Sequence, residues 1–131
     1  GLLVPVVKNA DESSMVGLSK QIADLGNLAR SKKLMPDEVA GLTFSITNPG
    51  IFGSLWGTPI IPQPSVAILG VGTIEKRAKV VTLADGTDTI AIKTCGYITL
   101  GFDHRVIDGA VADQFMSAVK SALENFDESA M

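Results

Sequence analysis

The sequence has 131 residues, a single-domain length, and 46% of them are hydrophobic, which is enough for a buried core. A formal net charge of −3 gives no electrostatic reason to expect a nucleic-acid partner. The single cysteine, Cys95, excludes an intramolecular disulfide and fits a reducing compartment. No apolar run reaches membrane-spanning length, so we expect no membrane insertion.

The first third of the chain predicts a short strand and a helix. The apolar residues 2–7 predict a short strand, and Pro5 within it indicates a sheet edge or a bulge. Ser13 or Ser14 can cap a helix that runs to about Lys33, because apolar residues recur there at three- and four-residue steps. A loop is expected at residues 36–38.

The middle of the chain predicts two strands joined by a glycine-rich connection. Residues 43–48 alternate as a strand does, and the connection that follows contains Gly50, Gly53 and Gly57. No Lys-Ser or Lys-Thr ends it, so it is not a phosphate-binding loop. The continuous apolar run at residues 65–71 predicts a strand that is covered on both faces.

The last part predicts a hairpin, a long strand and a helix. Residues 75–82 are expected to pair with a strand that begins at Asp88, through a turn containing Asp85 and Gly86. Alternation over residues 89–102 predicts one long strand with a buried face. That face contains Ile90, Ile92, Ile98, Leu100 and Phe102. The final helix is marked by Val111, Phe115, Val119, Leu123 and Phe126. These elements together predict an α+β layer with a mixed sheet.

The only histidine of the chain, His104, follows the long strand. It has the parity of the apolar face, so we expect its ring to point inward. Asp108 can cap the final helix. A strand end that carries a half-buried histidine beside a carboxylate is suited to catalysis. The structural alternatives are a histidine that only packs and an aspartate that only caps.

Three blocks of sequence carry a resemblance to a known family. The first is the string from Asp103 to Gly109 (DHRVIDG), which contains His-x-x-x-Asp-Gly. The second covers residues 41–70 (GLTFSITNPG, IFGSLWGTPII, PSVAILG), and the third is the opening GLLVPVVKNA. In this order they resemble the catalytic (E2) domain of the 2-oxo acid dehydrogenase complexes, the dihydrolipoyl acyltransferases.

The resemblance implies a fold and an extent. The family shares a chloramphenicol acetyltransferase-like two-layer sandwich with a mixed β-sheet. By this resemblance, residues 1–131 correspond to the C-terminal part of the catalytic domain, its second half only. The lipoyl domain, the peripheral-subunit-binding domain and their linkers would then lie outside this sequence.

The resemblance also implies site residues. His104 would be the general base that takes the proton of a thiol. Asp108 would order the site, largely by pairing with an arginine that lies outside this sequence. Thr47 would donate a hydrogen bond to the oxyanion, although a β-branched residue is also common in strands for its propensity alone. In this family the site forms between neighbouring subunits, so Thr47 and His104 need not be close within one chain. No metal is implied.

The implied activity is transfer of an acyl group between the dihydrolipoyl-lysine arm of a lipoyl domain and coenzyme A. The acyl group could be acetyl, succinyl or branched-chain. Expected partners are other copies, as a homotrimer or larger core, a lipoyl domain, and the E1 and E3 components through domains outside this sequence. The expected location is the cytoplasm, or the mitochondrial matrix in a eukaryote. The alternatives are a non-catalytic scaffold subunit of such a complex and a chloramphenicol-type acetyltransferase.

Overall fold

The computed structural model describes residues 3–127 and residue 129, which divide into two compact units. One unit is Phe44–Met116, and it contains every residue that the sequence proposes for catalysis. The other unit combines the residues before Phe44 with those after Met116. Among the described residues, no helix is both long and apolar enough to cross a bilayer.

Helix α1 (Met15–Arg30) is the main element of the unit that includes the start of the chain. The side chain of Ser14 accepts a hydrogen bond from the backbone N–H of Gly17 at 3.1 Å, so one of the two predicted caps is confirmed. Short 3-10 turns precede and follow the helix, η1 (Ala10–Glu12) and η2 (Pro36–Val39). The second of these turns occupies the predicted loop.

The edge strand predicted at the start of the chain is wrong for the residues that can be judged. Residues 3–7 form no strand, and residue 2 lies outside the described part. The backbone N–H of Val6 donates to the carbonyl of Glu38 at 2.7 Å, and one such contact does not make a ladder. The apolar run therefore predicted neither a strand nor full burial, since Leu3 and Val4 are 58% and 47% exposed.

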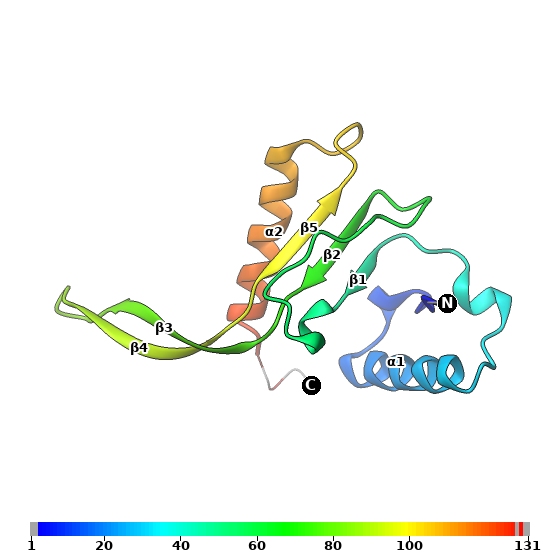
Figure 1. Cartoon of the computed structure of the whole chain (residues 1–131), viewed down its shortest axis with the longest axis horizontal. Helices are drawn as coiled ribbons and strands as arrows, with labels where there is room; N and C mark the ends of the chain where they lie inside the picture. Colours follow the sequence, from blue (N-terminus) through cyan, green and yellow to red (C-terminus); the bar gives the residue numbers. More distant parts are fainter. Residues whose placement is uncertain (1–2, 128, 130–131) are drawn as a thin grey trace. The chain divides into compact units, whose positions relative to one another are not determined.

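A three-stranded mixed sheet is the centre of the Phe44–Met116 unit (Figure 1). It consists of β1 (Ser45–Thr47), β2 (Ala67–Val71) and β5 (Ile98–Phe102). Strand β2 lies in the middle, parallel to β1 and antiparallel to β5. The strand predicted at residues 65–71 is thus observed as the shorter β2, and four of the five residues of β2 are buried.

The two faces of this sheet are covered by different parts of the chain. On one face, the first turns of α2 (Gly109–Glu124) approach the sheet, with Phe44 and Phe115 in an edge-to-face contact at 5.9 Å between ring centroids. On the other face the glycine-rich segment lies close, since the hydroxyl of Thr99 donates to the carbonyl of Gly57 at 2.8 Å. A Cβ at Gly70 would come within 2.6 Å of the Thr99 hydroxyl, so a larger residue here would have to displace that side chain.

Strands β3 (Glu75–Thr82) and β4 (Asp88–Cys95) form the predicted hairpin as a separate two-stranded sheet. The register runs from Glu75 opposite Cys95 to Thr82 opposite Asp88. Figure 1 shows this hairpin extending away from the three-stranded sheet of the same unit. At its tip, Gly86 has a φ of 83°, a left-handed conformation that glycine adopts readily.

The prediction of one long strand over residues 89–102 is wrong. The chain leaves the hairpin at Gly96 and Tyr97 and enters a different sheet as β5. Ile90 and Ile92, which were expected to be buried, are 74% and 75% exposed. Alternation identified an apolar face correctly, but none of the residues that the structure describes buries Ile90 and Ile92 on that face of β4.

The buried core of the described residues is small. Its hydrophobic members are Ala67, Ile68, Leu69 and Ala112, and no large side chain among the described residues is fully buried. The α+β class with a mixed sheet is confirmed. Many large apolar side chains stay exposed, which is typical of a surface that is covered in an assembly.

Candidate active site

The loop that carries His104 is built around Asp103. The backbone N–H of Asp103 donates to the carbonyl of Val66 at 2.9 Å, which extends the pairing of β5 with the β2 side by one residue. Its own carbonyl accepts hydrogen bonds from the N–H groups of Val106 and Ile107, both at 3.0 Å. One residue thus ends the strand and closes the turn that follows it.

The Asp103 carboxylate is also paired with Arg105. The guanidinium donates through Nε and Nη2 at distances from 2.6 to 3.1 Å, and the backbone N–H of Arg105 donates to Oδ1 at 3.0 Å. These hydrogen bonds from Arg105, with its positive charge, lower the pKa of Asp103 from 3.8 to about 2. Asp103 therefore stays ionised at neutral pH as half of an ion pair.

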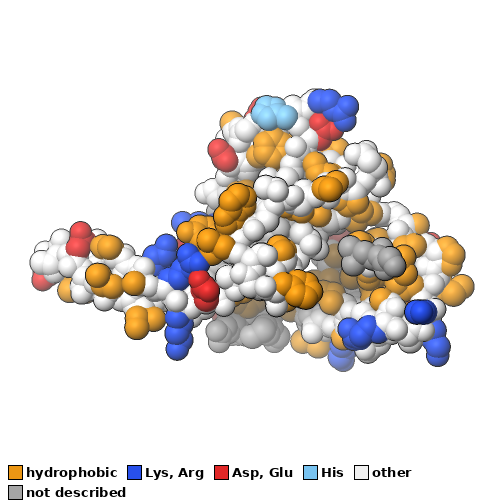
Figure 2. Space-filling model, viewed as in Figure 1, with side chains coloured by type: hydrophobic (Ala, Val, Ile, Leu, Met, Phe, Trp, Pro, Cys, Tyr) orange, Lys and Arg blue, Asp and Glu red, His pale blue; other side chains and the backbone are white. Residues whose placement is uncertain are grey.

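His104 is exposed, so the prediction that its ring points inward is wrong. The strand ends at Phe102, and the turn that follows does not continue its two-residue alternation. The imidazole lies beside the ring of Phe102, with 5.5 Å between centroids. Figure 2 shows the histidine at the surface of the molecule.

Asp108 begins helix α2, as predicted. Its Oδ1 accepts a hydrogen bond from the backbone N–H of Val111 at 2.9 Å, and its carbonyl accepts from Ala112 at 3.1 Å. Within residues 3–127 and 129 the Asp108 carboxylate has no ion-pair partner. The arginine that the family resemblance implies for it is therefore not supplied by the described residues.

Thr47 and His104 belong to the same sheet region but lie at opposite ends of it. Thr47 is level with Gly70 of β2, and Gly70 is level with Thr99 of β5, three residues before Phe102. From strand dimensions, the Cα atoms of Thr47 and Phe102 lie on the order of 14 Å apart, and His104 lies further along. One chain therefore does not bring Thr47 and His104 together, in line with the expectation that they need not be close.

Thr47 shares a sheet face with Ser45, the less apolar face of its strand, as expected. Ser45 is 6% exposed, and its hydroxyl has no hydrogen-bond partner among the described residues. The other face carries Phe44 and the 67%-exposed Ile46. The half-buried hydroxyl of Thr47 can donate to an oxygen that approaches its end of the sheet.

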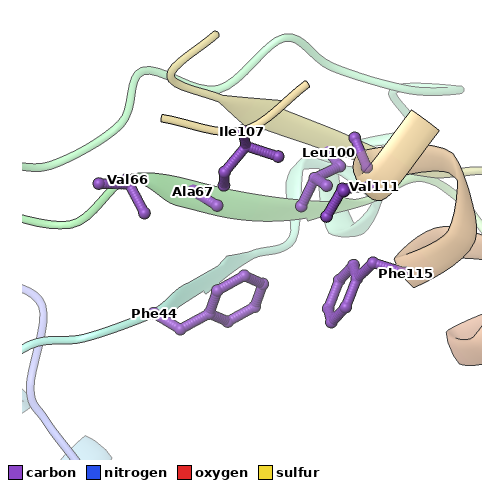
Figure 3. A pocket seen from close by; sticks show the side chains of 8 residues that line it. Phe44, Val66, Ala67, Leu100, Ile107, Val111 and Phe115 are labelled. Carbon is purple, nitrogen blue, oxygen red and sulfur yellow. The ribbon is translucent and has the colours of Figure 1, made fainter. Parts of the chain in front are cut away.

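An apolar cavity of about 240 Å³ lies between the sheet and the start of α2. It is lined by Phe44, Val66, Ala67, Leu100, Ile107, Val111, Ala112 and Phe115. Figure 3 shows the rings of Phe44 and Phe115 at one side of this space, with Ile107 from the histidine loop at another. Its lining offers no polar side chain, so it suits an apolar group and not a phosphate or a cation.

Sequence reasoning proposed His104, Asp108 and Thr47 as site residues and missed Asp103, the residue on which the hydrogen bonds of the loop depend. The signal was present, since an aspartate two residues before an arginine can pair with it across a tight turn. In the part of the chain that the structure describes, no group of three or more histidine, cysteine, aspartate or glutamate side chains forms a metal site.

Comparisons with known proteins place this chain in a family. A protein of Mycobacterium tuberculosis (strain CDC 1551 / Oshkosh), the dihydrolipoyllysine-residue acetyltransferase component of the pyruvate dehydrogenase complex, is 47% identical over 124 residues. These cover 95% of this chain and 22% of that protein. The succinyltransferase component of the 2-oxoglutarate dehydrogenase complex of Bartonella vinsonii subsp. berkhoffii is 46% identical, with 95% of this chain and 29% of that protein covered.

A solved structure supports the same family. It is the dihydrolipoamide acetyltransferase of Azotobacter vinelandii, with a TM-score of 0.82 and 39% identity, covering 95% of this chain and 49% of that chain. That study concerned the roles of a serine, a histidine and an asparagine in the catalytic mechanism, and its histidine and asparagine lie four positions apart, as His104 and Asp108 do.

This chain therefore spans less than a third of the curated relatives and about half of the structural neighbour. The model of one family, 2-oxoacid dehydrogenases acyltransferase (catalytic domain), matches residues 1–131. The chain belongs to the 2-oxoacid dehydrogenase acyltransferase family, and the similarity falls on its catalytic domain.

Proposed function

We propose that this chain is part of the catalytic core of a dihydrolipoyl acyltransferase, the E2 component of a 2-oxo acid dehydrogenase complex. The reaction moves an acyl group between the dihydrolipoyl-lysine arm of a lipoyl domain and coenzyme A. The observation that carries the proposal is an accessible histidine on a hydrogen-bonded loop, four residues before the aspartate that caps α2. Its location would be the cytoplasm, or the mitochondrial matrix in a eukaryote.

His104 would act as the general base. Its imidazole takes the proton from the thiol of coenzyme A, and the resulting thiolate attacks the carbonyl carbon of the acyl-dihydrolipoyl thioester. A tetrahedral oxyanion forms. When it collapses, the bond from carbon to the dihydrolipoyl sulfur breaks, and the imidazolium returns the proton to that sulfur. The histidine ends in its starting state, and the acyl group is on coenzyme A.

Thr47 would supply the hydrogen bond to the oxyanion, and it would come from a second copy of the chain. By strand dimensions the Cα atoms of Thr47 and Phe102 are about 14 Å apart and His104 lies further along, which argues against direct cooperation of Thr47 and His104 within one copy. A donor fixed in a strand costs little reorganisation when charge develops on the carbonyl oxygen. Asp108 would order the site from the start of α2.

A homotrimer, alone or within a larger core, is the assembly we propose. The hairpin supports this, because Val80, Ile90 and Ile92 share one face and are 69%, 74% and 75% exposed. An isolated two-stranded hairpin is marginally stable in water, so such a face needs a neighbour. The lipoyl domain and the E1 and E3 components would engage the complex through parts outside this sequence.

Sequence identity does not distinguish the acyl group, since the chain is 47% identical to an acetyltransferase and 46% identical to a succinyltransferase. The acyl group is therefore to be determined by experiment. The test compares the full-length protein with His104→Ala for transfer from acetyl-, succinyl- and isobutyryl-coenzyme A to dihydrolipoamide. We expect turnover with one donor and a loss of at least about a hundredfold in the variant. No turnover with any donor in an assembled oligomer would leave the scaffold alternative. Transfer to chloramphenicol instead would support the chloramphenicol-type alternative.

A further inference from the structure

The ion pair between Asp103 and Arg105 brackets His104 in the chain. The Asp103 side chain is 19% exposed and that of Arg105 is 85% exposed, so the carboxylate is the anchored member and the arginine reaches back to it. The backbone N–H of Arg105 points to the same carboxylate. The backbone N–H and the guanidinium of Arg105 thus both donate to the Asp103 carboxylate, and His104 is the residue between them in the chain.

The imidazole has little else to hold it. In the described part of the chain, its side chain makes no hydrogen bond, and its one ring contact is with Phe102. Its orientation is then set by the backbone of the turn, which is fixed at Asp103 by hydrogen bonds to Val66, Val106 and Ile107. A substitution at Asp103 or Arg105 would therefore alter the backbone conformation of the turn and with it the orientation of the His104 imidazole.

A second ion pair at the same two-residue spacing shows how the Asp103–Arg105 pair differs from an ordinary one. Glu75 and Arg77 also form an ion pair two residues apart, within strand β3, where side chains at that spacing share a face. In the His104 loop the backbone is a turn, and the carboxylate additionally accepts the N–H of Arg105. The pair at Asp103 therefore fixes backbone shape as well as side-chain position.

We infer that the Asp103–Arg105 pair is the positioning device for His104, which rests on the proposed function of His104 as the base. The hydrogen bonds of the two side chains run to each other and not to the imidazole, so the pair would act on His104 through the turn. The pair fixes the turn that orients the imidazole. Because its two charges are opposite, it also leaves no net charge beside the imidazole. Three charged groups share the loop with His104, namely Asp103, Arg105 and Asp108.

The test is a double-mutant cycle in the full-length protein, with Asp103→Asn, Arg105→Gln and both together. Rates are measured from pH 5 to 9 for acyl transfer to coenzyme A, with kcat and KM determined separately. We expect kcat to fall about tenfold in each single variant with KM nearly unchanged, because misaimed catalytic groups slow the chemical step. Lys120→Gln, which removes an exposed cation on α2, is the matched control and should change neither quantity.

The pH profile separates positioning from mere loss of structure. Arg105→Gln leaves an unpaired carboxylate beside the imidazole, which favours the imidazolium, so the acidic limb of the profile should move up by roughly half a pH unit. Asp103→Asn leaves an unpaired guanidinium, and the limb should move down. The double variant should return the limb to its original position without restoring kcat. Arg105→Lys should restore the limb more fully than kcat, because lysine keeps the charge but not the two-point contact.

The inference is overturned if both single variants keep kcat within twofold and leave the acidic limb in place. A fall in kcat without opposite movements of the limb also overturns it, because a general loss of structure would do the same. Failure of the proposed function looks different, since His104→Ala would then retain the acyl-transfer rate. If His104→Ala is inactive but the Asp103 and Arg105 variants keep the wild-type kcat and pH profile, the histidine is the base and another feature positions it.

Discussion

The Oδ1 atom of Asp108 accepts the backbone N–H of Val111 at 2.9 Å, so the carboxylate that follows His104 by four residues also starts helix α2. A helix start leaves backbone N–H groups without partners, and a short oxygen-bearing side chain satisfies one of them. The histidine loop and the helix are thereby joined at one residue.

Two replacements of Asp108 should distinguish the contribution of its helix cap from that of its negative charge. Asparagine caps as well as aspartate, whereas alanine removes the acceptor, so Asp108→Ala should lose about 1 kcal/mol of unfolding free energy and Asp108→Asn almost none. We expect Asp108→Asn to keep most of the acyl-transfer activity, since the Azotobacter vinelandii protein has an asparagine at this spacing from its histidine. Urea unfolding and activity assays check both points. Equal destabilisation by the two changes would contradict the capping role.

The ionisation of Asp103 predicts a specific acid sensitivity. Arg105 lowers the pKa of Asp103 from 3.8 to about 2 in the folded protein. The stabilisation from this pair is therefore fully present above about pH 4 and is lost as pH falls from 4 towards 2. Wild-type protein should be more stable than Asp103→Asn at pH 5, and the difference should shrink across that window. Circular dichroism during urea unfolding at each pH measures it.

Arg105→Gln is the matched variant for the acid experiment, because it removes the same pair from the other side. Its stability should follow that of Asp103→Asn through the same pH window. A difference from wild type that stays constant between pH 5 and pH 2 would show that the pair does not set the acid sensitivity.

Local signals predicted the fold best where a turn or cap fixed the register. The hairpin formed with the expected partners because the residues around Gly86 favour a tight turn. Asp108 started its helix because a cap acts within one turn of the chain. The apolar run over β2 was buried because this strand lies in the middle of the sheet, paired on both sides.

The errors arose where burial depends on a distant surface. Ile90 and Ile98 have the same parity, yet β4 belongs to an exposed hairpin and β5 to the central sheet. Alternation reports which face is apolar and says nothing of what covers it. His104 was placed inward by extending strand parity past Phe102 into a turn. The pairing of Asp103 with Arg105 depends on the shape of that turn, which the alternation pattern does not encode.

A shared site between copies predicts that two inactive variants rescue each other. Thr47→Val removes the hydroxyl with little change in volume and should lower kcat by about a hundredfold or more, as loss of one oxyanion donor does. A mixture of Thr47→Val and His104→Ala chains, unfolded and reassembled together, contains interfaces with an intact Thr47 and an intact His104. We expect activity to return to roughly a quarter of wild type in randomly mixed trimers.

The controls for rescue are the two variants reassembled separately and then combined without exchange of chains. Both should stay inactive. Thr47→Ser keeps a hydroxyl at the same position and should keep most of the activity. Rescue that never exceeds the sum of the separate variants, although mass spectrometry shows mixed oligomers, would place Thr47 and His104 in the same copy or remove Thr47 from the reaction.

The exposed face of the hairpin predicts where the assembly can be broken. Ile92 lies opposite Ala78 and on the same face as Val80 and Ile90, so Ile92→Lys would place an unpaired ammonium in the proposed contact. Thr89→Lys adds the same charge on the opposite face of β4 and is the control. Analytical ultracentrifugation should show a lower mass for Ile92→Lys and an unchanged mass for Thr89→Lys. The reduced assembly should also lose acyl transfer, because His104 would then lack the Thr47 of a neighbour. An Ile92→Lys protein with wild-type mass would exclude this face from the contact between copies.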